Sequence, residues 1–348
     1  MNPYVLMILL SSLGLGTTLT FASSHWLLAW MGLEINTLAI IPLMAQHHHP
    51  RAVEATTKYF LTQATAAAMI MFASTTNAWI TGEWDMNNMS SPLANTMIII
   101  ALALKIGLAP MHFWMPEVLQ GLDLMTGMIL STWQKLAPFA LIMQTAHTVD
   151  PTLLTILGGL STLIGGWGGL NQTQLRKILA YSSIAHMGWM IIILQYAPQL
   201  TLLALGTYIF MTSAAFLTLK MSSATKINTL AMTWSKTPIL TTTTALVLLS
   251  LGGLPPLTGF MPKWLILQEL TKQDLPATAT IMALAALLSL YFYLRLCYAM
   301  TLTISPNTTN SATPWRIKTA QTLLPLATST TIALGLLPMT PAILMLTT

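Results

Sequence analysis

Charged residues are scarce in this sequence. Asp, Glu, Lys and Arg together make up 7% of its 348 residues, whereas apolar residues make up 54%. A soluble domain contains about 25% charged residues, so this chain has too few of them to cover a surface that faces water. The scarcity excludes a soluble globular protein and predicts an all-α polytopic membrane protein, because helices satisfy their own backbone groups in lipid.

Cysteine is represented by Cys297 alone. A single cysteine excludes both a disulfide framework and a cysteine-ligated zinc or iron–sulfur site. Three consecutive histidines, His47, His48 and His49, precede Pro50, but three side chains in a row do not readily converge on one ion. No metal and no bound cofactor are therefore expected on this chain.

Several functional signatures are also absent. The sequence has no nucleotide-binding fingerprint, no catalytic triad and no feature that points to a nucleic-acid partner. A glycine cluster at 165–169 lacks phosphate-loop spacing and lies in an apolar run, where it predicts close helix packing. The N-terminus lacks the basic region and cleavage site of a targeting sequence, so we expect its apolar run to be retained as a helix.

Eleven apolar runs are long enough to span a membrane, which takes about 20 residues per helix. We expect these helices near residues 3–21, 26–45, 59–80, 94–115, 124–147, 152–170, 177–196, 200–220, 238–272, 276–300 and 321–346. The ninth run is too long for one straight span.

The loops test this count independently. When the N-terminus is placed on one side, the loops and helix ends of that side contain nine basic residues: Arg51, Lys58, Arg176, Lys177, Lys220, Lys226, Lys236, Arg316 and Lys318. The equivalent segments of the opposite side contain only one basic residue, Lys272. Basic residues concentrate on the cytoplasmic side of a membrane, or on the matrix side in an organelle, so we expect the N-terminus there.

One stretch of the chain occurs twice. Gly107-Leu-Ala-Pro-Met-His-Phe-Trp-Met-Pro-Glu117 returns as Gly253-Leu-Pro-Pro-Leu-Thr-Gly-Phe-Met-Pro-Lys263. Each copy places glycine and proline inside a run that should otherwise be continuous helix: Gly107 and Pro110 in the first, Gly253, Pro255 and Pro256 in the second. Proline lacks a backbone donor and clashes with the carbonyl one turn back, so each copy predicts a broken helix near the middle of the membrane.

The two copies divide the chain into two halves. They lie in the fourth and ninth predicted helices, an odd number of spans apart, so the repeat crosses the membrane in opposite directions. A second pair of segments agrees: Ala29–Glu34 in helix two resembles Ala185–Met190 in helix seven. We therefore expect two inverted five-helix repeats, helices 1–5 (residues 1–150) and 6–10 (151–301), followed by a loop and a C-terminal helix (302–348). Inverted repeats with broken helices are typical of ion-translocating proteins.

Four ionisable residues fall near the middle of predicted spans or beside a break: Glu34, Lys105, Lys135 and Lys263. Each costs at least about 2.5–3.5 kcal/mol at a helix centre, so an unneeded one should be rare. One explanation is a structural ion pair, such as Glu34 with Lys105, although Lys135 and Lys263 then have no acidic partner left in mid-span. The other is a proton relay, because burial favours the neutral amine of a lysine and a nearby carboxylate favours its ammonium form.

Two histidines lie among these positions. His112 falls inside the first break and His186 in the middle of the seventh predicted helix. Neutral imidazole can accept a proton on one nitrogen and release one from the other, so both are candidates for a relay. A hydrogen-bonded packing role is an equal alternative for each of them.

Two segments in each half resemble a known family. They are Trp30–Asn36 and Leu104–Trp114 in the first half, and Leu175–Gly188 and Gly252–Lys263 in the second. They resemble the antiporter-like, proton-pumping membrane subunits of respiratory complex I, which are related to subunits of multisubunit cation/proton antiporters. The resemblance runs the full length, although typical members have fourteen helices. A count of eleven helices resembles the animal mitochondrial members of the family, which are shorter by three helices at the N-terminus.

The resemblance implies a role for each buried charge. Glu34 matches the glutamate that modulates the first-half lysine, and Lys105 matches that lysine on the broken helix. Lys135 matches the connecting lysine on the next helix, and Lys263 matches the second-half site. His186 matches a position that is commonly polar or histidine in the family.

The resemblance also implies what this chain lacks and what it joins. NADH, FMN, iron–sulfur clusters and ubiquinone would be bound by other subunits, so NADH:ubiquinone reductase activity would belong to the complex and no redox site to this chain. The expected partners are other complex I subunits, especially neighbouring antiporter-like ones, and membrane lipids. The expected location is the mitochondrial inner membrane, with the N-terminus in the matrix.

Two functions remain open at this point. The first is a proton-translocating subunit of a redox-driven complex, and the second is a stand-alone cation/proton antiporter. A cation carrier should offer several carboxylates in mid-membrane to hold Na⁺ or K⁺, and this chain has one, Glu34, which favours the first function. A pure membrane scaffold would not need four buried charges.

Overall fold

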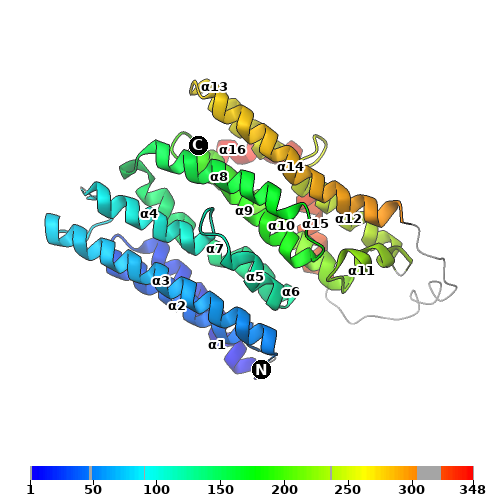
Figure 1. Cartoon of the computed structure of the whole chain (residues 1–348), viewed down its shortest axis with the longest axis horizontal. Coiled ribbons are helices and arrows are strands. Elements are labelled where there is room, and N and C mark those ends of the chain that lie inside the picture. Colours follow the sequence, from blue (N-terminus) through cyan, green and yellow to red (C-terminus); the bar gives the residue numbers. More distant parts are fainter. Residues whose placement is uncertain (1, 47–48, 90, 236, 304–322, 348) are drawn as a thin grey trace. The chain divides into compact units, whose positions relative to one another are not determined.

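The computed structural model describes residues 2–46, 49–89, 91–235, 237–303 and 323–347. Within these residues every regular element is a helix, and extended structure is limited to two isolated bridges, His25 with Asp85 and Gln174 with Lys226. The chain forms two compact units, Met1–Leu157 and Gly158–Thr348. Figure 1 shows the helices of both units, coloured along the chain.

Unit 1 is built around one long helix, α3. Its elements are α1 (Pro3–Ala22), α2 (Trp26–Met44), α3 (Pro50–Thr81), α4 (Pro92–Ile106), α5 (Trp114–Gly121), α6 (Leu124–Ser131), α7 (Trp133–Thr145) and the 3₁₀ helix η1 (Ala146–Thr148). α3 packs against α2, α4 and α5, while α1 packs along α2 and against α7. α8 (Pro151–Gly169) begins in this unit and ends in the next.

Two glycines let α1 and α2 approach each other. A Cβ on Gly16 would lie 2.8 Å from the carbonyl oxygen of Gly32, and a Cβ on Gly32 would lie 2.9 Å from that of Gly16. Any larger residue would push the two backbones apart. Small residues at a helix crossing are a common device in membranes, where close backbone packing replaces the hydrophobic effect as a source of stability.

Unit 2 is built around α10. Its elements are α9 (Leu175–Ile193), α10 (Pro198–Met221), α11 (Ile227–Ala231), the 3₁₀ helix η2 (Met232–Ser235), α12 (Pro238–Gly252), α13 (Phe260–Lys272), α14 (Pro276–Thr301), α15 (Leu324–Gly335), the 3₁₀ helix η5 (Leu337–Met339) and α16 (Thr340–Thr347). α10 packs against α9, α12, α13 and α15. Proline opens α10, α12 and α14, where its missing N–H would have had no helical partner.

The glycine cluster of α8 packs tightly, as predicted. A Cβ on Gly165 would lie 2.7 Å from the backbone nitrogen of Ala185 and 2.9 Å from the carbonyl oxygen of Tyr181, both on α9. A Cβ on Gly169 would meet the ring of Phe292 on α14 at 2.8 Å. These glycines therefore serve helix packing.

Not every predicted span is long enough to cross a membrane by itself. In the described part, five helices are long and apolar enough, α1, α2, α8, α10 and α14, or six if the bent pair Leu324–Gly335 and Leu337–Met345 counts as one span. Breaks shorten others, such as α4 and α12. The total of eleven spans, and the boundaries of the two inverted repeats, therefore stay predictions.

Three predicted helices differ from the observed ones. The third begins at Pro50 instead of residue 59, because Nδ1 of His49 accepts a hydrogen bond from the Arg51 N–H (3.2 Å) and caps the helix. The fifth is interrupted at Thr132, and the last bends by 67° after α15. Proline accompanies both interruptions, Pro138 in α7 and Pro338 in η5, because its ring crowds the carbonyl four residues earlier.

Candidate functional site

Both copies of the repeated stretch break their helices, as predicted. Irregular chain separates α4 from α5 and α12 from α13. Each break begins at a glycine in the left-handed region, with φ +85° at Gly107 and +83° at Gly253. Their N–H groups turn back to carbonyls of the preceding turn. A left-handed cap favours glycine, which has no Cβ.

The prolines contribute less to the breaks than the sequence suggests. Pro110 in the first copy, and Pro255 and Pro256 in the second, come after the helix has already ended at the glycine. They keep the chain from resuming a helix at once, because each lacks a backbone donor. Pro116 and Pro262 fall in the first turns of α5 and α13, where proline is tolerated.

The two breaks are stabilised by different side chains. Nε1 of Trp114 donates to the carbonyl oxygen of Leu104 (3.0 Å), near the C-terminal end of α4. Phe260 takes the place of this tryptophan in the second copy and has no donor. There, Nζ of Lys263 donates to the carbonyl oxygen of Gly252 (2.9 Å) at the end of α12. Lys263 is thus held by the break itself.

Lys105 lies in the last turn of α4 and is 5% exposed. Its Nζ atom has no hydrogen-bond partner among the described residues, and the same is true of Oε2 of Glu34. Glu34, on α2, acts on Lys105 electrostatically. No ion pair joins the two residues in the part of the chain that the structure covers, so the structural ion pair raised as an alternative is not formed here.

Lys135 lies in the first turn of α7, directly after the interruption at Thr132. Oγ1 of Thr132 donates to the carbonyl oxygen of Met128 (2.7 Å), a local bond that often bends a helix. Pro138 adds to the bend because it cannot donate to Gln134, four residues earlier. The Lys135 side chain is 2% exposed, so the interruption places a lysine in the interior of unit 1.

Lys105 and Lys135 line one cavity of about 20 Å³, counted as the space open to the centre of a water molecule. A cavity of this size can hold a water where its lining offers polar partners. The lining also includes Asn36, Thr37, Tyr59, Gln63, Ile106, Trp114, Met115 and Gln134. The cavity therefore forms where both helix interruptions of unit 1 meet, and it brings two predicted relay lysines together.

The two candidate histidines lie apart from this cavity. His112 is 4% exposed, and its Nδ1 lies 3.3 Å from the carbonyl oxygen of Pro110 inside the first break. His186 lies on α9 in unit 2, with its ring 5.7 Å from the ring of Tyr208 on α10. Both positions are compatible with packing and with proton transfer, so their relay role stays a prediction.

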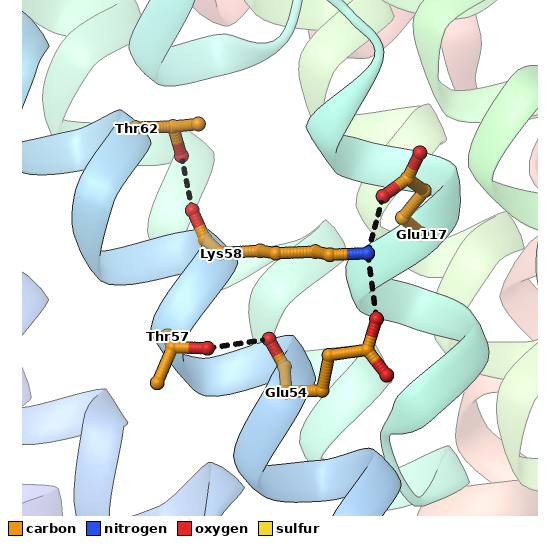
Figure 2. Close-up of polar contacts among 5 residues, drawn as sticks. All are labelled: Glu54, Thr57, Lys58, Thr62 and Glu117. Atoms are coloured by element: carbon orange, nitrogen blue, oxygen red, sulfur yellow. Dashed lines mark hydrogen bonds and ion pairs between the residues drawn. The ribbon is translucent and has the colours of Figure 1, made fainter.

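A charged cluster joins α3 to α5 at the exposed start of α3. Nζ of Lys58 lies 2.7 Å from Oε1 of Glu54 and 2.8 Å from Oε2 of Glu117, as Figure 2 shows. α3 has 32 residues, which at about 1.5 Å per residue exceeds the roughly 30 Å of a bilayer core, so its first turns extend beyond the span. Hydrogen bonding to Glu117 raises the pKa of Lys58, and the hydrogen bond from Lys58 lowers the pKa of Glu54.

No group of three or more His, Cys, Asp or Glu side chains that could hold a metal occurs among the described residues. Of the histidine run before Pro50, His49 caps α3, while His47 and His48 lie outside the described residues. Lys236, Arg316 and Lys318 of the charge count lie outside them as well.

Sequence reasoning missed the amides of the cavity. Gln63 on α3 and Gln134 on α7 line it, and Gln63 is 3% exposed. A buried glutamine in an apolar run was the available signal, because burying an amide without a partner is costly. The pattern could not show that α3 and α7 present these amides to the same space as the two lysines.

Comparison with known proteins identifies the family. Residues 23–289 match the family described as NADH:quinone oxidoreductase/Mrp antiporter, TM, and residues 290–344 match the NADH dehydrogenase subunit 2 C-terminus. The chain is 86% identical to NADH-ubiquinone oxidoreductase chain 2 of Carassius auratus, with 100% of both chains covered. It is 79% identical to the protein of the same name from Danio rerio, again over 100% of both.

Solved structures agree with this assignment. Respiratory complex I from Thermus thermophilus contains a chain that is 28% identical, with a TM-score of 0.86, 99% of this chain covered and 80% of that one. A chain of the Mrp complex from Dietzia sp. shares the fold at 14% identity, with a TM-score of 0.83, 97% of this chain covered and 76% of that one. The chain therefore belongs to the NADH-ubiquinone oxidoreductase chain 2 family, within the wider group of NADH:quinone oxidoreductase and Mrp antiporter membrane subunits.

Proposed function

We propose that this chain is a proton-translocating membrane subunit of respiratory complex I. The observation that carries the proposal is the full-length match to the chain 2 family, together with three lysines placed at helix interruptions. Helix interruptions leave backbone groups free to bind ions or water at membrane depth, and a lysine beside one can exchange a proton with them.

The proton relay of the first half begins with Glu34 and Lys105. A nearby carboxylate favours the ammonium form of a lysine, so a change in the separation of Glu34 and Lys105 would change the proton affinity of that lysine. Lys135 shares a cavity with Lys105 and receives the proton from it. Lys263 is the relay group of the second half, where its hydrogen bond to Gly252 fixes the amine beside the break. His112 and His186 are further candidates in each half.

The energy for this transport comes from other subunits. NADH, FMN, iron–sulfur clusters and ubiquinone bind elsewhere in the complex, and neighbouring antiporter-like subunits and lipids surround this chain. It spans the mitochondrial inner membrane eleven times, as two inverted repeats plus a C-terminal helix, with its N-terminus in the matrix. Membership of the chain 2 family and the excess of basic residues on one side support this arrangement.

The proposal is tested by extracting the membrane with a gentle detergent, separating native complexes on a gel, and identifying what migrates with this chain. We expect it in one very large particle that oxidises NADH. Migration alone, or with a few antiporter-like chains and without NADH oxidation, would contradict the proposal and favour a stand-alone cation/proton antiporter.

A further inference from the structure

Gln63 presents an unused donor to the cavity of unit 1. It lies on α3, is 3% exposed, and its Nε2 atom has no hydrogen-bond partner among the described residues. A buried amide left without a partner is costly, so such groups usually bind a water or a ligand. Gln63 also lines the cavity that contains Lys105 and Lys135.

Two other polar side chains of this cavity already have a hydrogen-bond partner. Nε2 of Gln134 donates to the backbone oxygen of Asn36 (3.3 Å), and Oγ1 of Thr37 donates to the backbone oxygen of Glu34 (2.9 Å). Both polar atoms of the Asn36 side chain also lack a partner among the described residues, and this amide packs against Gly16 of α1. Within the described part of the chain, Gln63 and Asn36 are therefore the two amides of the cavity with an unused donor, and Gln63 is the one on the central helix α3.

The size and polarity of the cavity decide what that molecule is. About 20 Å³ is open to the centre of a water-sized sphere, which is enough for one water and too little for an organic ligand. Nζ of Lys105 likewise lacks a partner within the described residues, so a water there would satisfy two buried polar groups at once.

We propose that Gln63 is a positioning residue that binds a water bridging Lys105 and Lys135; the inference rests on the proposed proton relay. The amide N–H of Gln63 donates to the water oxygen. The ammonium of Lys105 gives one proton to the water as the water gives another to the neutral amine of Lys135. One proton moves from lysine to lysine and the water is regenerated.

The first test is the position of water in the intact complex. A cryo-EM map that resolves ordered water should show density within about 2.6–3.2 Å of Nε2 of Gln63, inside the cavity. A map of that quality with a dry cavity would overturn the proposal.

The second test compares two variants of the intact complex. Gln63→Met keeps the length of the side chain and removes its amide, and Gln172→Met makes the same change at an amide of unit 2 that bonds the Gly168 carbonyl and does not line this cavity. We expect Gln63→Met to lose the water density and to translocate fewer protons per NADH oxidised, whereas Gln172→Met keeps the normal ratio. Retention of both density and ratio in Gln63→Met would contradict the proposal.

A Lys135→Met complex distinguishes a failure of this inference from a failure of the proposed proton relay on which it rests. If Lys135→Met lowers the proton ratio and Gln63→Met does not, the relay stands and the positioning role of Gln63 falls. If Lys135→Met has no effect, the relay itself fails, and the Gln63 proposal fails with it.

Discussion

Lys105 and Lys135 line the same cavity, Lys105 from the C-terminal end of α4 and Lys135 from the N-terminal end of α7. Lys105 lies in the last turn of α4, the negative end of that helix dipole, and Lys135 lies in the first turn of α7, the positive end of that helix dipole. The dipole of α4 therefore favours a positive charge on Lys105, and that of α7 opposes one on Lys135. A connecting group that releases its proton readily suits a relay.

Replacing Lys135 with methionine tests this position at the residue scale. The change removes the charged group but keeps an unbranched side chain, so we expect the complex to assemble and to translocate fewer protons per NADH oxidised. The ratio is measured with purified complex in sealed vesicles.

The control is Lys272→Met, which removes a lysine whose side chain is 60% exposed. We expect it to keep the normal proton ratio. An unchanged ratio in an intact Lys135→Met complex would exclude Lys135 from the path.

At the scale of elements, the broken helices depend on left-handed glycines with different surroundings. A Cβ on Gly253 would lie 3.0 Å from Cδ and Nζ of Lys263, whereas the nearest atom to a Cβ on Gly107 would be Cζ2 of Trp114 at 3.4 Å. Gly82, with φ +77°, has no atom within 4 Å of such a Cβ. The left-handed backbone conformation is therefore common to all three glycines, but of the three only Gly253 borders a relay lysine.

Alanine at these glycines should separate strain from function. Each substitution costs roughly 1–2 kcal/mol of strain, because the left-handed region crowds a Cβ. We expect similar falls in melting temperature for Gly82→Ala and Gly253→Ala, but a lower proton ratio only for Gly253→Ala, since its methyl displaces the Lys263 amine. Equal proton ratios in the two variants would show that the position of Lys263 does not depend on this glycine.

Helix packing in unit 2 offers a second prediction for elements. Gly165→Ala places a methyl against the backbone of α9 and should destabilise the protein by about 1–3 kcal/mol, as overpacking does. Gly159→Ala, on the same helix with no atom within 4 Å, should be neutral or slightly stabilising. Thermal unfolding of the purified complex measures both, and equal melting temperatures would rule out a tight α8–α9 contact.

At the scale of the whole molecule, the lysines beside helix interruptions (Lys105, Lys135 and Lys263) differ from exposed charges such as those around Lys58. The Lys58 cluster is of the second kind, with side chains 43–63% exposed, so water screens it and its contribution to stability is small. It connects α3 with α5, the helix that follows the first break (Figure 2). The cluster therefore links α5, which follows the first break, to α3, the central helix of unit 1.

The contribution of this cluster should depend on pH in a defined direction. Because the pKa of Glu54 is lowered, the stability that Glu54 contributes is fully present above its ordinary pKa of about 4.5. This stability is lost as the pH falls through the lowered pKa. Because the pKa of Lys58 is raised, the stability that Lys58 contributes is fully present below its ordinary pKa of about 10.5 and is lost as the pH rises through the raised pKa. The difference in melting temperature between the wild type and Lys58→Met should thus be constant near neutral pH and should shrink in acid.

High salt and a matched variant test whether the Lys58 cluster stabilises the protein through its charges. About 1 M salt shortens the screening length to about 3 Å and should remove most of the difference. Lys272→Met, which breaks a pair with Glu269 inside the single helix α13, should not loosen one helix from another. A salt-independent effect of Lys58→Met would show that packing of its aliphatic part matters more than its charge.

Much of the architecture could be predicted because its causes are local. Insertion of a charge in lipid is costly wherever it occurs, so Glu34, Lys105, Lys135 and Lys263 stood out without a structure. Glycine followed by proline ends a helix whatever its neighbours are, and both breaks were found. The interruption at Thr132 was missed, because a single proline six residues later is a weaker signal than a glycine–proline cluster.

The sequence by itself determined that this is a helical membrane protein with two repeated helix breaks and a few buried charges. Only the tertiary structure decided which groups meet: Lys105 with Lys135 and Gln63 around one cavity, Lys263 with the carbonyl of Gly252, and Glu34 without an ion pair. The physical reason is that helix formation and insertion depend on residues close together in the chain. A shared cavity depends on how side chains from six helices fill the space between them, which no local pattern records.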